Sequence, residues 1–177
     1  MRLLNSQKEQ VEKFFCLPAG NFPNNRAYPV ILYKQVFSGE RLPGAALIEE
    51  AVAENNWLPA WRFSVYSFDH YHSTAFEFLG CFTGDAVLQF GGPEGKVVNF
   101  RCGDAVIIPP GVGHRQLDCS YSFCCVGAYP PGQSPDLLRG RRPVTMQSRR
   151  NIAAVSPPLL DPVYGVNFSS FIAGFCS

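Results

Sequence analysis

The stretch FDHYHSTAFEFLG, residues 68–80, carries His70 and His72, two of the three histidines in the chain, and has Glu77 five residues after the second. We expect the first part of this stretch to be a β-strand, in which side chains alternate between two faces. His70 and His72 would then point the same way, about 6.5 to 7 Å apart. Two imidazoles at that spacing can converge on one ion, and Glu77 would return on the next strand after a bend at residues 73–75.

The third histidine follows a predicted tight turn in GDAVIIPPGVGH, residues 103–114. Pro110 and Gly111 suit the two central positions of a type II turn, because proline fixes φ and glycine accepts a positive φ. His114 comes directly after this turn, where the chain re-enters the sheet. Such a turn can hold His114 rigidly opposite the hairpin that carries the other candidate ligands.

The spacing of these residues resembles the two sequence motifs of the cupin superfamily. The first motif, G-x5-H-x-H-x(3,4)-E-x6-G, reads here as His70-x-His72-x4-Glu77-x6-Gly84. The second motif, G-x5-P-x-G-x2-H-x3-N, reads as Gly103-x5-Pro109-x-Gly111-x2-His114-x3-Asp118. Ser64 stands in place of the leading glycine and Asp118 in place of the final asparagine, and neither position is a metal ligand in cupins.

The flanking sequence is similar to the small YjlB-type cupins over most of residues 28–165, with HYHSTAFEFLG, PPGVGH, VGAYPPGQ and DPVYG as the matching segments. Those proteins often have a histidine just before the glutamate, where this chain has Phe76. Strand alternation would point Phe76 away from Glu77.

The resemblance implies an all-β fold, the double-stranded β-helix or jelly-roll barrel of the cupins, with six to eight strands and short N-terminal helices. The residue pattern agrees, since short apolar stretches alternate with turn signals from Trp57 onward. The resemblance also implies a divalent metal ion held by His70, His72, Glu77 and His114. Nitrogen and oxygen ligands suit Fe, Mn, Ni or Zn without choosing among them.

The sequence suggests three regions. Residues 1–56 would form an extension that packs on the barrel, with a helix at 7–16 introduced by a capping box, a strand at 28–37 and a helix at 43–56. Residues 57–132 would form the barrel, and 133–177 an irregular tail. Five arginines make part of this tail basic: Arg139, Arg141, Arg142, Arg149 and Arg150. We interpret this part as a solvated extension in preference to a phosphate or nucleic-acid patch.

The composition and charge of the chain exclude several functional classes from our expectations. The 177 residues include 46% hydrophobic and 16% charged residues, and the formal charge is +1, so neither nucleic acid nor a membrane is an expected partner. Seven cysteines with no CxxC pair argue against a disulfide framework and a zinc knuckle. With no signal peptide and no apolar window near about 18 residues, we expect a cytoplasmic protein.

We expect a metal-dependent oxidoreductase, dioxygenase-like, acting on a small phenolic or enolic substrate. Glu77 is a candidate base, and Tyr66, which shares a strand face with His70, is a candidate hydrogen-bond donor to the substrate, although a barrel-lining aromatic is an equally good interpretation. A non-redox isomerase, cyclase or decarboxylase and a non-catalytic binding cupin remain alternatives. By resemblance to other cupins, we expect a homodimer paired through the strand at 28–37.

Overall fold

Two antiparallel sheets form the body of the molecule in the computed structural model, which describes residues 11–38 and 43–174. Within these residues the larger sheet has six strands in the order β1-β2-β7-β4-β9-β3, and the smaller has three in the order β6-β5-β8. The strands are β1 (Val11–Phe14), β2 (Val30–Tyr33), β3 (Leu58–Phe63), β4 (Glu77–Thr83), β5 (Asp85–Phe90), β6 (Lys96–Arg101), β7 (Ala105–Ile108), β8 (His114–Cys119) and β9 (Cys124–Tyr129). The helices are α1 (Ala45–Glu54), α2 (Met146–Ala154) and α3 (Phe168–Ala173).

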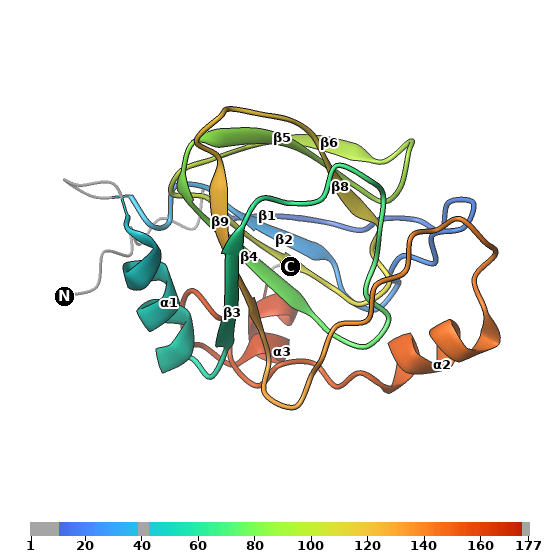
Figure 1. Ribbon diagram of the computed structural model, residues 1–177. Coiled ribbons are helices and arrows are strands. Elements are labelled where there is room, and N and C mark those ends of the chain that lie inside the picture. Colours follow the sequence, from blue (N-terminus) through green and yellow to red (C-terminus); the bar gives the residue numbers. More distant parts are fainter. Residues whose placement is uncertain (1–10, 39–42, 175–177) are drawn as a thin grey trace.

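The two sheets face each other as in a jelly roll, without closing into a continuous barrel (Figure 1). Apolar side chains from both sheets fill the space between them, and we call this group the interior core. Leu79 and Val106 come from the larger sheet, and Leu88, Phe90 and Phe100 from the smaller. The predicted all-β jelly-roll fold is therefore confirmed, with nine strands in the described residues where we expected six to eight.

A second apolar group, the outer core, covers the opposite face of the larger sheet. It brings Phe76 and Phe78 together with Ile48 of α1 and Phe168 of α3. Helix α1 lies so close to β4 that a Cβ on Gly80 would approach Ile48 Cγ2 to 2.7 Å. Because both faces of the larger sheet are buried, its central strands are apolar almost throughout.

Alternation along β4 separates these two cores and places the candidate site. Leu79 and Cys81 belong to the interior core, whereas Phe76 and Phe78 belong to the outer core. Glu77 therefore points to the same side as Leu79, into the space between the sheets. The expectation that Phe76 faces away from Glu77 is confirmed.

The predicted N-terminal helix at 7–16 is wrong over the part that the structure describes. Residues 1–10 lie outside the described residues, and Val11–Phe14 form β1, which pairs antiparallel with β2. Here the strand pairing outweighs the local preference for a helix. The predicted helix at 43–56 is confirmed as α1, Ala45–Glu54.

The predicted strand at 28–37 is present but short and central rather than at an edge. It is β2, Val30–Tyr33, with all four residues buried. It pairs with β1 on one side and β7 on the other. Both of its edges are paired within the chain, and the homodimer stays a prediction.

The segment after residue 132 is more ordered than the irregular tail that the sequence suggested, because it contains α2 and α3. It is also tied to the body, since Trp57 Nε1 donates to Leu160 O at 3.0 Å and the Tyr33 hydroxyl donates to Asp161 Oδ2. In the described part of the chain, no helix has the length and apolar character needed to cross a membrane.

Candidate metal site

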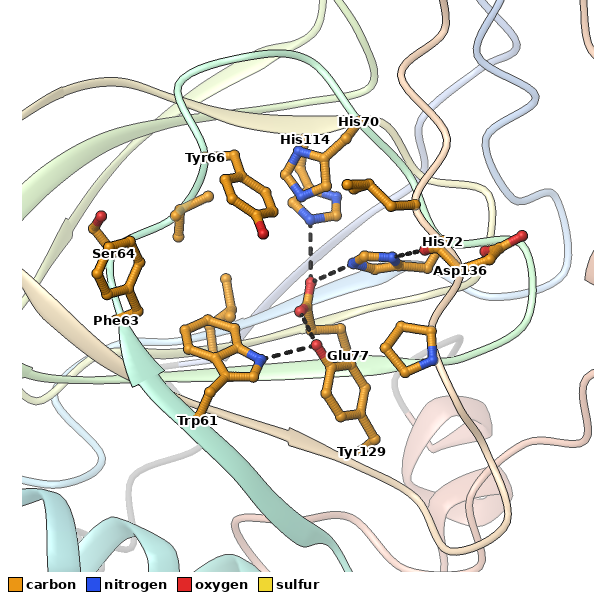
Figure 2. Close-up of a pocket in the computed structure, with 14 residues that line it drawn as sticks. Trp61, Phe63, Ser64, Tyr66, His70, His72, Glu77, His114, Tyr129 and Asp136 are labelled. Atoms are coloured by element: carbon orange, nitrogen blue, oxygen red, sulfur yellow. Dashed lines mark hydrogen bonds and ion pairs between the residues drawn. The ribbon is translucent and has the colours of Figure 1, made fainter.

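A cavity of about 420 Å³ lies beside β3, β4 and β9 and holds every candidate site residue (Figure 2). Its walls are mainly aromatic and aliphatic, and its polar side chains gather around one point. The lining residues are Trp61, Phe63, Ser64, Val65, Tyr66, His70, His72, Glu77, Leu79, His114, Tyr129, Pro135, Asp136 and Leu137.

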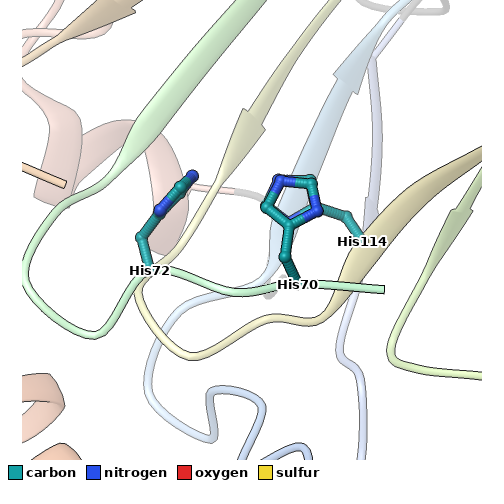
Figure 3. Close-up of side chains that lie close together, drawn as sticks. All are labelled: His70, His72 and His114. Carbon is teal, nitrogen blue, oxygen red and sulfur yellow. The ribbon is translucent and has the colours of Figure 1, made fainter. Parts of the chain in front are cut away.

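The three histidines converge although His70 and His72 lie outside any regular strand, which corrects the strand expected across residues 68–72. An isolated β-bridge holds His70 to His114, with His70 N to His114 O at 3.1 Å and His114 N to His70 O at 2.8 Å. The predicted turn before His114 is in place, with Gly111 at φ 89°. One ring nitrogen from each histidine lies within 4.8 Å of the others, and all three residues are buried (Figure 3).

Each histidine has its Nδ1 atom against a backbone carbonyl. His70 Nδ1 lies 3.0 Å from Phe68 O, His114 Nδ1 lies 3.0 Å from Val112 O, and His72 Nδ1 contacts Asp136 O. A carbonyl oxygen only accepts hydrogen bonds, so a neutral imidazole in this setting carries its proton on Nδ1. The Nε2 lone pairs are then left free, which is the usual arrangement behind metal-binding histidines.

Glu77, the first residue of β4, completes the polar cluster. Its Oε2 atom lies 3.4 Å from His72 Nε2 and 3.1 Å from His114 Nε2. Its Oε1 atom accepts a hydrogen bond of 2.7 Å from the Tyr129 hydroxyl, whose oxygen accepts another of 2.9 Å from Trp61 Nε1 (Figure 2). The carboxylate is 3% exposed, so these contacts replace its hydration.

The electrostatics of the cluster favour a positive charge between Glu77 and the imidazoles. Burial lowers the pKa of His70 to about 3, with the nearby His114 adding to the effect, so this ring is neutral. Burial alone would lower the pKa of His72, but the Glu77 carboxylate outweighs it and the pKa is raised. Burial alone would raise the pKa of Glu77, but His72 and His114 hold it well below its usual range.

The residues fit a divalent metal ion. His114 Nε2 is buried and has no hydrogen-bond partner, and with the proton on Nδ1 its lone pair faces a carboxylate oxygen. Two acceptors that face each other out of water repel unless a cation lies between them. Three imidazole nitrogens and one carboxylate oxygen form a donor set suited to Fe, Mn, Ni or Zn.

Four further residues divide between the cavity and the two cores. Tyr66 lines the cavity at its rim, 47% exposed, and its ring lies edge-on to His70 with centroids 5.2 Å apart. Trp61 also lines the cavity. Cys81 lies in the interior core as a free thiol, and Phe76 lies in the outer core.

Sequence reasoning missed Tyr129 and Asp136. Tyr129 is brought to Glu77 by the pairing of β4 with β9, in which Phe78 lies opposite Ala128. Asp136 is brought to His72 by a β-bridge between Tyr71 and Leu138. Knowledge of these two pairings would have revealed both residues, but no spacing along the chain encodes them.

Comparison with known proteins supports this description. No protein-family model matches the chain. The chain is 34% identical over 158 residues to the uncharacterized protein YjlB of Bacillus subtilis (strain 168), and the match covers 89% of this chain and 93% of that protein.

Among solved structures, the chain matches an uncharacterized conserved protein with a double-stranded beta-helix domain from Klebsiella pneumoniae subsp. pneumoniae MGH 78578. The identity is 13% and the TM-score 0.31, over 77% of this chain and 86% of the other. At this TM-score the likeness adds nothing to the fold assignment, which rests on the two antiparallel sheets and the two motifs. By its identity to YjlB over nearly the whole of both proteins, and by those motifs and sheets, the chain belongs to the same family as YjlB within the cupin superfamily.

Proposed function

We propose that this protein is a metal-dependent cupin enzyme in which His70, His72, His114 and Glu77 hold one divalent ion. The observation that carries this proposal is the convergence of three buried histidines, each with Nδ1 on a carbonyl, beside a buried carboxylate. When bound, such an ion would act as a Lewis acid and, if redox-active, would support oxidation.

The cavity walls favour a small, uncharged, flat substrate such as a phenol or an enol. Among the residues that the structure describes, no lysine or arginine lines the cavity, and its two charged lining side chains beside the histidines, Glu77 and Asp136, are both acidic. A carboxylate or phosphate on the substrate would therefore meet neither a lysine nor an arginine in the described part of the chain. Trp61, Phe63 and Tyr66 instead offer aromatic surfaces on which a flat ring can pack. A volume of about 420 Å³ lies within the range of small-molecule sites.

Two residues have proposed roles toward the substrate. Glu77 accepts a proton from the substrate, since its carboxylate lines the cavity beside the histidines. The Tyr66 hydroxyl donates a hydrogen bond to a substrate oxygen from the cavity rim. Burial of the histidines and Glu77 limits the access of water to this end of the cavity.

The test begins with the metal. Elemental analysis of the protein as isolated, followed by titration of metal-free protein with Fe(II), Mn(II), Ni(II) and Zn(II), should give one ion per chain. His72→Ala and His114→Ala should lose that ion. Asp118→Asn is the matched control, because Asp118 belongs to the same motif but is exposed on β8. A wild-type protein that takes up none of these ions would contradict the proposal.

The reaction type is tested next on the loaded protein. Oxygen uptake with catechols and with 1,3-diketones, abolished in His72→Ala, would support the oxidoreductase. Turnover of the same compounds by the zinc-loaded protein without oxygen would instead identify an isomerase, cyclase or decarboxylase. Metal binding with no turnover in either arm would indicate a binding cupin and overturn the catalytic part of the proposal.

A further inference from the structure

The two carboxylate oxygens of Glu77 have different surroundings. Oε2 faces the imidazoles of His72 and His114. Oε1 points away from them and accepts the hydrogen bond from Tyr129, 2.7 Å long and buried. The carboxylate is therefore divided between the candidate metal site and a hydroxyl on the neighbouring strand β9.

Trp61 determines the direction of that hydroxyl. Its indole N–H donates to the Tyr129 oxygen at 2.9 Å, so the Tyr129 proton is left to point at Glu77. The indole itself is held in place against the backbone, because a Cβ on Gly127 would approach Trp61 Cε2 to 2.0 Å. Only glycine at position 127 leaves room for the indole there.

We propose that Tyr129, oriented by Trp61, is a positioning residue that restricts Glu77 to a single oxygen, Oε2, toward the metal. This inference rests on the proposed function, since it concerns the ion that the histidines and Glu77 would hold. Without the Tyr129 hydroxyl, Oε1 has no hydrogen-bond donor and is free to turn toward the ion. A carboxylate that offers both oxygens occupies a position that would otherwise be open to a substrate or another small ligand.

This role predicts a change in coordination rather than a loss of fold or metal. Co(II) is a suitable probe, because its visible spectrum reports the number and arrangement of its ligands. Azide reports an open position on the ion. We expect Tyr129→Phe to bind one Co(II) per chain, to show a shifted Co(II) spectrum, and to bind azide about tenfold more weakly than the wild type.

Trp61→Phe provides a second variant that leaves Tyr129 in place and removes the orienting donor. It should shift the Co(II) spectrum in the same direction and by less. If Tyr129→Phe does not fold, Trp61→Phe alone decides the proposal, and an unchanged spectrum there would overturn it.

The chain contains a matched control far from the site. The Tyr33 hydroxyl also donates to a buried carboxylate, Asp161, but in the outer core. Tyr33→Phe removes the same kind of hydrogen bond, so it should lower stability while leaving the Co(II) spectrum and azide binding unchanged. An equal spectral shift in Tyr33→Phe would show a general effect of destabilisation and would overturn the proposal.

The outcomes separate this inference from the proposed function. Wild-type protein that binds no Co(II) contradicts the metal site itself. Wild-type protein that binds Co(II), with a spectrum and azide affinity that Tyr129→Phe leaves unchanged, contradicts only the role of Tyr129.

Discussion

Protons and a metal ion compete for the same nitrogen of His72. The pKa of this residue is raised, because Glu77 outweighs the effect of burial, whereas the pKa of His70 is lowered to about 3. As the pH falls through the neutral range, His72 therefore gains a proton in the metal-free protein while His70 stays neutral. An incoming ion must displace that proton.

We accordingly expect the apparent zinc affinity to fall by about tenfold per pH unit below the pKa of His72. Calorimetric titrations in buffers of different ionisation enthalpy should show release of about one proton per ion. Zinc affinity that is constant from about pH 8 to about pH 6 would show that His72 is not a ligand.

Phe76 illustrates how neighbouring residues can belong to different parts of the molecule. It is fully buried in the outer core, where its ring packs edge-on against Tyr28 at 5.3 Å and Phe168 at 5.8 Å. Glu77, one residue later, lies in the cavity. A histidine at position 76 would place a polar ring among aromatic side chains, on the far side of the sheet from the candidate metal site.

Phe76→His should therefore destabilise the protein by about 3 kcal/mol and leave zinc affinity unchanged. Urea unfolding measures the first effect and a zinc titration the second. Phe76→Leu, which keeps the site apolar, is the control and should cost less, about 1 kcal/mol. Tighter zinc binding in Phe76→His would contradict this assignment of the two faces.

At the scale of elements, residues 133–138 form a segment that lies along residues 71–76 and hydrogen-bonds to His72 and its neighbours. The Asp136 carbonyl contacts His72 Nδ1, and the Asp136 carboxylate accepts from Ser73 N and Ser73 Oγ, both at 2.5 Å. Tyr71 and Leu138 add two backbone hydrogen bonds. His70 and His114, by contrast, are held by carbonyls two residues earlier in their own segments.

Asp136→Ala keeps the backbone carbonyl that contacts His72 and removes the two carboxylate hydrogen bonds to Ser73 that fix its position, so it should loosen His72. We expect zinc affinity to fall by about tenfold. Stability should fall by about 1 to 3 kcal/mol, because the buried Ser73 N–H loses its acceptor. Ser134→Ala is the control, since Ser134 is exposed and contributes its backbone carbonyl, which accepts from Thr74 Oγ1. Unchanged zinc affinity in Asp136→Ala would show that the bridge from Tyr71 to Leu138 is enough to hold the ring.

These elements also show what the sequence could predict. The spacing of His70, His72, Glu77 and His114 was sufficient to group them, because it matches the two motifs of the cupin superfamily. The strand β1 was not predictable, since its sequence favours a helix and only pairing with β2 makes it a strand. Tyr129 and Asp136 were missed for the same reason, because contacts between distant segments leave no local pattern.

At the scale of the whole molecule, the larger sheet is shared by both cores, so the cavity and the outer core depend on the same strands. The segment after residue 132 contributes side chains to both the cavity and the outer core. Asp136 reaches the cavity, and Phe168, which is fully buried, packs in the outer core. The three regions suggested by the sequence, 1–56, 57–132 and 133–177, should on this basis unfold together.

The two tryptophans allow a direct measurement, because Trp57 lies in the outer core and Trp61 lines the cavity. Phe168→Ala should cost about 4 kcal/mol by leaving a hole in the outer core. If the molecule is one cooperative unit, the fluorescence of Trp57 in a Trp61→Phe background and of Trp61 in a Trp57→Phe background should both shift to the same lower urea midpoint. Ser169→Ala, at an exposed neighbouring position, should shift neither. The contradicting result would be a lower urea midpoint for Trp57 with an unchanged midpoint for Trp61. It would mean that the C-terminal segment and the outer core unfold separately from the cavity. A substitution at Phe168 can lower the stability of the candidate metal site only if both regions unfold in one shared transition.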